Sequence, residues 1–196
     1  MGNTALVIVT EPSEEPITLD QAKQHLRIDT EDDDTLILGL IKVAREYAET
    51  ATRRALMTQT WNYYLEDWPK EDHIDLPMAP LQSIGATGIT YENSSGGVTT
   101  LTTGYYEVDT LSVPGRVVLG YNESWPTATL NVSNPICIKF VAGHGTPDDV
   151  PEMIKSGMKI DLADLYEQRE SYIIGQTVNH LPVLDRLYTP FKVWGF

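Results

Sequence analysis

The chain has almost no cysteine and no long apolar run, and both absences narrow what it can be. Cys137 is the single cysteine in 196 residues, so an intrachain disulfide and the cysteine pairs of a zinc motif are excluded. No apolar stretch approaches the roughly 18 to 20 residues that a membrane-spanning helix requires. The opening segment MGNTALVIVTEPSEEP lacks the basic start and cleavage site of a signal peptide. We therefore expect a protein of the cytoplasm with no membrane partner.

Basic residues are also scarce. The chain has 14 Lys and Arg against 28 Asp and Glu, which gives a formal net charge of -14. A protein that grips the phosphate backbone of DNA over a broad surface needs the opposite balance. We therefore expect any DNA that approaches this chain to be repelled.

Sequence signals for catalysis, metals and cofactors are missing as well. The four histidines, at 25, 73, 144 and 180, have no metal-ligand spacing. The segment AGHGTPDD lacks the third glycine of a dinucleotide loop and the Lys of a phosphate loop, and no G-x-S-x-G elbow is present. We predict no enzyme activity, no catalytic residue, no metal ligand and no cofactor.

Hydrophobic periodicity divides the chain into three parts and predicts an α+β fold. Residues 1–57 are expected to form an N-terminal helical part, residues 58–145 a β-rich module, and residues 146–196 C-terminal helices with a docking tail. We expect the N-terminal helix pair and the C-terminal helices to pack as one helical body. The β-rich module would be a small antiparallel sheet or barrel inserted into it.

Two helices are predicted before residue 58. Thr18 and Gln21 fit a capping box, which predicts a helix over residues 19–28. A second helix is predicted over residues 32–54, because Ile37, Ile41 and Ala44 begin an apolar stripe at helical spacing. Toward the other end of the chain, the pattern predicts a helix over residues 151–168 and a short helix near Pro182 to Tyr188.

Between the helical parts the apolar period changes to two, which is typical of strands. TQTWNYYLEDW alternates, SIGATGITYENSSGGVTTL reads as two strands around a turn, and GRVVLGY and PICIKFVAG are two more. We expect about five to seven strands in this module.

A row of four acidic residues, Glu31 to Asp34, precedes the second predicted helix. A calcium loop is disfavoured because its sixth position would be Asp34 instead of Gly. The unpaired N–H groups of a first helical turn stabilise carboxylates, so the row is explained by a helix start that Asp29 or Thr30 would cap.

The end of the chain is unusually apolar for a terminus. Phe191, Val193, Trp194 and Phe196 are four apolar residues within six positions. A free terminus seldom exposes so many. Together with the absence of a recognisable active site, this pattern favours a protein that works by assembly.

The order of landmarks resembles the head-tail connector (adaptor) proteins of long-tailed double-stranded DNA phages and prophages. The resemblance spans Pro16 to about Val193. It rests on EPITLDQAKQHLRID, the helix that ends in RRALMTQTW, the LPMAPL loop, FVAGHG and YEQRE.

This resemblance implies a structural virion protein that is made in the host cytoplasm and joins capsid to tail. The family forms a ring, commonly of twelve subunits, beneath the portal protein, and meets a stopper or tail-completion protein on its other side. DNA passes through the ring without specific binding. A tail-completion or stopper protein, and a β module that binds glycan, remain as alternative functions.

Within such a ring we expect three groups of residues to matter. The acidic side chains of Glu31, Asp32, Asp33 and Asp34 would either line the channel or remain an outward, solvated helix start. The apolar end, Phe191, Val193, Trp194 and Phe196, would dock on the portal. Subunit contacts would involve five residues of the helical body: Leu36, Leu40, Tyr47, Met158 and Tyr166.

Overall fold

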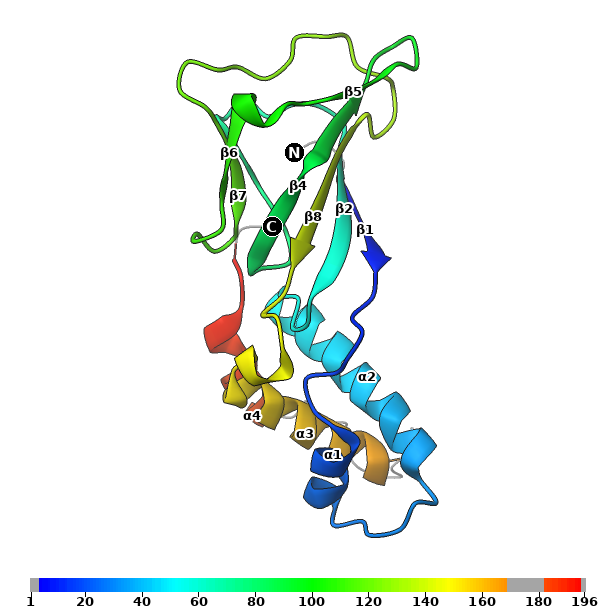
Figure 1. Cartoon of the computed structure of the whole chain (residues 1–196). Coiled ribbons are helices and arrows are strands. Elements are labelled where there is room, and N and C mark those ends of the chain that lie inside the picture. Colours follow the sequence, from blue (N-terminus) through cyan, green and yellow to red (C-terminus); the bar gives the residue numbers. More distant parts are fainter. Residues whose placement is uncertain (1–3, 169–181, 195–196) are drawn as a thin grey trace, which may run out of the picture. The chain divides into compact units, whose positions relative to one another are not determined.

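The computed structural model describes residues 4–168 and 182–194 of the chain (Figure 1). These residues fall into two compact units. We call them the β-rich unit, which comprises residues 4–12 and 58–144, and the helical unit, which comprises the described residues of 13–57 and 145–194. The α+β fold class predicted from the sequence is confirmed.

A five-stranded antiparallel sheet dominates the β-rich unit. Its strands are, in chain order, β1 (Thr4–Thr10), β2 (Gln59–Leu65), β4 (Leu81–Glu92), β5 (Val98–Thr100) and β8 (Ile136–Ala142). In space the order is β1-β2-β8-β4-β5, so β1 and β5 are the two edges. In the central strand β8, buried residues alternate with half-buried or exposed ones, and Ile136, Ile138 and Phe140 fill the core beneath it.

A second, three-stranded antiparallel sheet completes this unit. It consists of β3 (His73–Asp75), β7 (Arg116–Leu119) and β6 (Tyr106–Asp109), in that spatial order. The short 3-10 helix η1 (Thr103–Tyr105) leads into β6. Val117 of the middle strand is fully buried, so this sheet also contributes to the core of the unit.

The sequence predicted several of these strands and missed others. The predicted hairpin in SIGATGITYENSSGGVTTL is confirmed, since Glu92 of β4 pairs with Val98 of β5. The segments GRVVLGY and PICIKFVAG contain β7 and β8 as expected. The prediction did not single out β3 and β6, and it left β1 within the helical part of residues 1–57. In the structure β1 pairs with β2 of the β-rich unit.

The helical unit is built on α2 (Asp34–Thr52), which packs against α3 (Glu152–Glu167). The buried stripe of α2 contains Ile37, Ile41, Ala44 and Ala48, which is the stripe that the periodicity predicted. The helices α1 (Leu19–Leu26) and α4 (Pro182–Tyr188) cover the same core. Burial of these apolar side chains supplies the main stabilisation of the unit.

Helix ends in this unit follow local sequence signals only in part. The predicted capping box of α1 is present, because the Thr18 hydroxyl accepts from the Gln21 N–H at 3.2 Å and the Gln21 side chain accepts from the Thr18 N–H. The prediction that Asp29 or Thr30 caps the second helix is wrong. α2 begins at Asp34, and its N-cap residue Asp33 makes no capping hydrogen bond.

Before α3 the chain makes the 3-10 turn η2 (Pro147–Asp149), and after α4 it makes η3 (Thr189–Phe191). The carboxylate of Asp149 accepts from the backbone N–H of Thr146 at 2.9 Å and from its hydroxyl at 2.7 Å. This carboxylate therefore closes η2 instead of capping the helix that follows, whose N-cap residue is Pro151.

Candidate functional site

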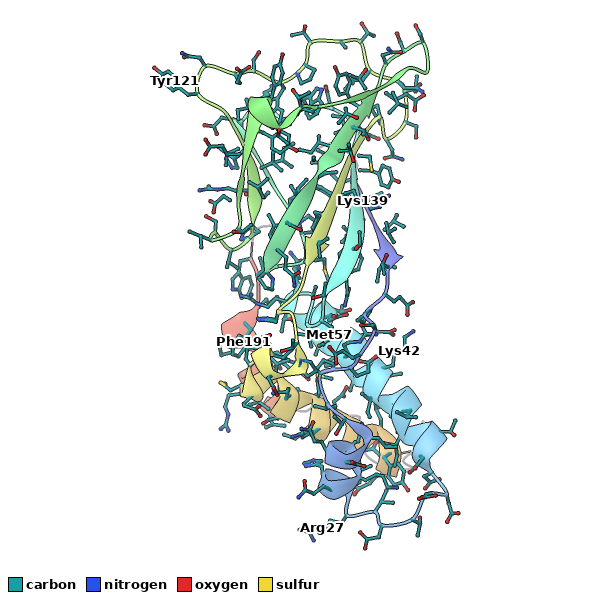
Figure 2. All side chains as sticks on the ribbon, in the orientation of Figure 1. Arg27, Lys42, Met57, Tyr121, Lys139 and Phe191 are labelled. Carbon is teal, nitrogen blue, oxygen red and sulfur yellow. The ribbon has the colours of Figure 1, made fainter. Side chains whose placement is uncertain are left out.

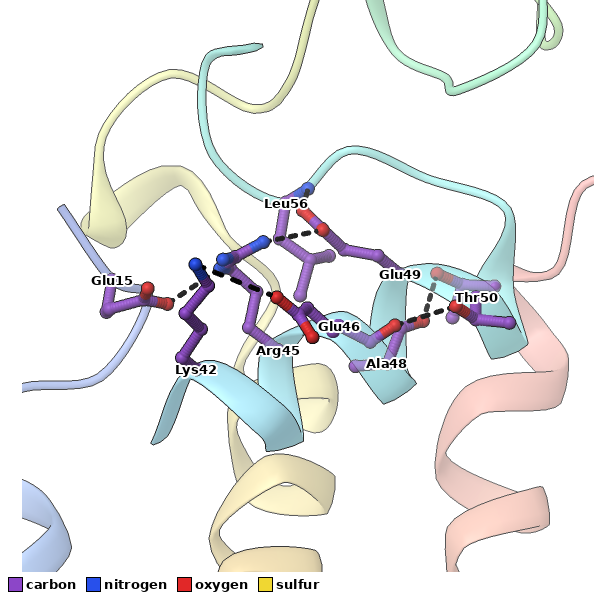
Figure 3. Close-up of polar contacts among 9 residues, drawn as sticks. Glu15, Lys42, Arg45, Glu46, Ala48, Glu49, Thr50 and Leu56 are labelled. Carbon is purple, nitrogen blue, oxygen red and sulfur yellow. Dashed lines mark hydrogen bonds and ion pairs between the residues drawn. The ribbon is translucent and has the colours of Figure 1, made fainter. Parts of the chain in front are cut away.

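A buried ion pair fixes the middle of α2. Arg45 Nη1 lies 2.8 Å from Glu49 Oε2, and Arg45 Nε lies 2.7 Å from Glu15 Oε2 (Figure 3). Glu49 also accepts from the backbone N–H of Leu56 at 2.9 Å. Burial alone would lower the pKa of Arg45, but the two carboxylates outweigh it and raise that pKa above its usual value. This network ties the segments on both sides of α2 to the helix.

The predicted acidic row divides into two engaged and two exposed side chains. The Tyr166 hydroxyl of α3 donates to the carboxylate of Asp33, and Lys23 Nζ of α1 lies 2.7 Å from Asp34 Oδ1. Glu31 and Asp32 are exposed to solvent. Within the helical unit, Asp33 and Asp34 therefore hold three helices together at the start of α2, and only Glu31 and Asp32 point freely outward.

The five predicted contact residues also separate by exposure. On α2, Leu36 is 39% exposed and Tyr47 is 37% exposed, whereas Leu40 is half-buried against the core. Tyr166 is half-buried beside Asp33. Met158 is fully buried among the core residues of the unit, so its side chain offers no surface to another subunit.

The apolar end of the chain is partly core. Val193 is buried, and its backbone N–H donates to the Thr52 carbonyl at 2.9 Å. Phe191 is half-buried against the core, and its carbonyl accepts from Arg54 Nε at 2.6 Å; the labelled side chain can be followed in Figure 2. Trp194 is 69% exposed. Phe196 lies outside the described residues.

A half-buried cation lies beside the exposed tryptophan. Lys192 Nζ lies 4.8 Å from the centre of the Trp194 ring, which is within the range of a cation–π contact. Together, Lys192 and Trp194 form the accessible part of the predicted docking end. We call this pair the Trp194 tip.

In the β-rich unit, Trp68 and Trp125 stack on each other. The rings of Trp68 and Trp125 are 5.1 Å apart and almost parallel, and Trp125 Nε1 donates to the Glu71 carbonyl at 2.8 Å. Trp68 also meets the ring of Tyr91 edge-on. These contacts hold the loop before β8 against the segment after β2. They use ring faces that a glycan would need.

The described residues offer little sign of a metal site, a membrane-spanning helix or a reactive nucleophile. Residues 4–168 and 182–194 contain no group of three or more His, Cys, Asp or Glu side chains that could hold a metal ion. No helix among these residues is long and apolar enough to cross a membrane. Burial raises the pKa of the Cys137 thiol, which lowers its nucleophilicity at neutral pH.

Residues 16–110 match the family of phage gp6-like head-tail connector proteins. The match covers just under half of the chain and identifies it as a head-tail connector protein. It is therefore a structural component of a virion that acts at the junction of head and tail, and the family match favours neither a stopper protein nor a glycan-binding module.

Three solved structures are similar to this connector over nearly its whole length. A chain from the neck of an empty gene transfer agent particle, computed with C6 symmetry, has a TM-score of 0.78 at 19% identity, covering 98% of this chain and 97% of that one. A chain from the native virion of such a particle has a TM-score of 0.77 at 19% identity, covering 97% and 96%.

The third similar chain comes from the neck of the native particle, computed with C12 symmetry. Its TM-score is 0.74 at 18% identity, with 98% of this chain and 97% of that one covered. At these identities the likeness establishes a common fold for both units of the connector. No curated protein matches the chain.

Sequence reasoning missed one conspicuous surface. Val7, Ile8 and Val9 of β1 are between 38% and 49% exposed, although they form the most apolar stretch near the start of the chain. The available signal was the run ALVIV itself, which has strand-forming residues and no charge.

Proposed function

We propose that the connector assembles as a ring at the head-tail junction, between the portal protein and a stopper or tail-completion protein, and that DNA passes through its bore. The family match over residues 16–110 carries this proposal. The C6 and C12 symmetries of the similar neck structures support a cyclic assembly. Ring closure requires heterologous contacts, in which one surface of a subunit meets a different surface of its neighbour.

One flank of α2, beside the face that packs on the core, is a suitable place for such a contact, although the ring of Tyr47 there also meets that of Tyr188 edge-on. Leu36, Leu40 and Tyr47 follow one another at spacings of four and seven, so they lie along one side of the helix, and Leu36 and Tyr47 are exposed. Val43, which is 46% exposed, completes this stripe. An apolar stripe of this length on a helix matches the seam of a helix–helix interface.

The Trp194 tip is our proposed contact with the portal protein. Exposed tryptophans supply much of the binding energy at protein interfaces. Phe191 and Val193 support the tip from the core, because their backbone groups are bonded to Arg54 and Thr52. The tip is therefore held in place before any partner arrives, which reduces the ordering cost of binding.

The exposed carboxylates of Glu31 and Asp32 are our proposed channel lining. A bore lined with negative charge repels phosphates and prevents DNA from adhering. The proposed role is purely electrostatic, and it fits a protein that serves as a passage and has no catalytic task.

The Trp194 tip can be tested with particles that carry a portal but no tail. Trp194→Ser should abolish or weaken attachment of the purified connector, as measured by sedimentation with particles and by imaging of rings. Tyr121→Ser is the matched control, because Tyr121 is 93% exposed on a loop of the β-rich unit (Figure 2). Equal attachment of both variants would exclude the tip as the docking site. Failure of the unaltered connector to form rings on these particles would overturn the function itself.

A further inference from the structure

The two sheets of the β-rich unit differ in whether their edge strands carry charged residues. The edges of the three-stranded sheet are β3 and β6, which are short and carry ionisable side chains: His73, Asp75, Glu107 and Asp109. Charged residues on short strands are a common means of preventing unwanted strand pairing.

The edges of the five-stranded sheet lack this protection. Thr4–Thr10 and Val98–Thr100 contain only Thr, Ala, Leu, Val and Ile, without a charge or a proline. Their exposed apolar side chains include Val7, Ile8 and Val98, the last at 69%. In the part of the chain that the structure describes, no strand pairs with the outer side of β1 or of β5. Backbone donors and acceptors on both edges are therefore open to a further strand.

We propose that β5 of one subunit pairs with β1 of the next, so that the five-stranded sheets continue from copy to copy. This inference rests on the proposed ring. A second copy is the favoured occupant because the similar neck structures were computed with C6 and C12 symmetry. Copies that each carry a net charge of -14 repel one another least along uncharged strips such as these edges. The two free edges lie on opposite sides of one sheet, which is the arrangement that a head-to-tail contact needs.

The topology also fixes the direction of this pairing. Each of the four neighbouring pairs from β1 to β5 is antiparallel, so β1 and β5 run in the same direction. When one sheet is continued by the next copy, β5 and the neighbour's β1 are consequently parallel. β5 has three residues, so it engages only part of the seven-residue β1. The exposed half of β1, from Val7 onward, is the matching part.

Cysteine crosslinking tests this contact directly. In a Cys137→Ala background, Val7→Cys and Thr99→Cys are combined, and the assembled protein is treated with a short bifunctional thiol reagent that tolerates a shift of register. Neighbouring strands lie about 4.8 Å apart, so the two cysteines of adjacent copies would be within its reach. The expected result is a ladder of covalent multimers on a denaturing gel, with no ladder from either single cysteine.

The other possible crosslinking results each support or overturn the proposed edge contact. Val7→Cys combined with Leu111→Cys is the control, since Leu111 is 93% exposed in the hairpin of the other sheet, and an equal ladder from it would overturn the proposal. A covalent dimer from Val7→Cys alone would show β1 paired with β1, which also overturns it. Rings without a ladder leave the proposed function standing and remove the edge contact. A ladder without closed rings supports the edge contact and contradicts the ring.

A second pair of variants does not depend on crosslinking. Thr99→Glu together with Val7→Glu places like charges on both edges, and should raise the concentration needed for assembly by about tenfold or more. Leu111→Glu is the control and should assemble like the unaltered connector. Thermal unfolding of all variants verifies that they are folded. Normal assembly of the folded edge variant would overturn the proposal.

Discussion

Arg45 and Glu49 lie one turn apart on α2 and form a 2.8 Å ion pair that is shielded from solvent. Both side chains are almost fully buried, and each has a second partner: Glu15 for Arg45 and the Leu56 N–H for Glu49. A buried pair of this kind adds little net stability compared with apolar residues of the same volume. Its significance is that neither partner can be removed alone.

Glu49→Ala should therefore lower the free energy of unfolding by about 3 to 5 kcal/mol, because it leaves the buried guanidinium of Arg45 without its main counter-charge. Urea denaturation measures the change. Glu46→Ala is the matched control: this exposed residue of the same helix lies 4.0 Å from Lys42, and its loss should cost less than about 1 kcal/mol. Similar losses in both variants would contradict the special role of the buried pair.

Gly39 of α2 and Gly157 of α3 should respond in opposite ways to alanine. A Cβ at Gly157 of α3 would lie 2.6 Å from Cε1 of Tyr188, so Gly157→Ala should destabilise the helical unit by about 1 to 3 kcal/mol. A Cβ at Gly39 of α2 would meet nothing within 4 Å, so Gly39→Ala should stabilise the helix by up to about 1 kcal/mol. Thermal unfolding distinguishes the two signs. A stable Gly157→Ala protein would show that α4 does not pack against α3 as described.

Asp161 should make the helical unit less stable as the pH rises. Burial raises the pKa of this half-buried carboxyl, and the charge of Asp164 raises it further. The folded state then binds a proton more tightly than the unfolded chain. Stability consequently falls as pH rises from the unfolded pKa, near 4, through the raised folded value.

Asp161→Asn removes this penalty, so it should increase the free energy of unfolding at neutral pH, and the gain should shrink as the pH approaches about 4. Urea denaturation at a series of pH values measures it. A gain that does not vary with pH would point to packing instead of ionisation.

Trp125 should hold the loop that precedes β8 in its folded conformation. Trp125→Ala removes the stacked ring on Trp68 and the hydrogen bond to Glu71, so we expect a loss of about 2 kcal/mol, less than for a fully buried tryptophan. Limited proteolysis should then cut within residues 120–135. Tyr121→Ala, in the same loop, should leave both stability and cleavage unchanged because this side chain is exposed.

Reversing charge at Glu31 and Asp32 tests the proposed channel lining. Particles with Glu31→Lys and Asp32→Lys should release their genome incompletely at low salt and normally at high salt, because Lys contacts with phosphate are screened. Asp148→Lys with Glu123→Lys makes the same change of charge at exposed positions elsewhere. If this control pair delays release equally, the effect is one of overall charge, and Glu31 and Asp32 do not line the bore.

Local signals explain which parts of this fold could be predicted. The capping box at Thr18 and Gln21 and the stripe on α2 involve residues within a few turns of each other, and both are confirmed. The contact between Asp33 and Tyr166 joins residues 133 positions apart, and no local sequence pattern predicts it. The strand partner of β1 is also far away in the sequence, since Thr4 pairs with Leu65. A run such as ALVIV shows strand preference but does not reveal which strand it joins.

The candidate surfaces were harder to predict, for a related reason. Met158 and Leu36 both follow helical apolar patterns, yet Met158 fills the core and Leu36 is exposed. Periodicity shows that something covers an apolar stripe, but it cannot distinguish a neighbouring helix of the same subunit from another subunit. Val193 and Trp194 differ in the same way, although they are adjacent in the sequence.

The alternation of the chain between its two units has a consequence for synthesis on the ribosome. β1 emerges first but must wait for β2, and the sheet is complete only when β8 ends at Ala142. α2 emerges early as well, and its packing partner α3 appears only after Ala142. We therefore expect the β-rich unit to fold first, while the apolar stripe of α2 stays uncovered for about 100 residues of elongation. During that interval the nascent connector would be a natural client of chaperones.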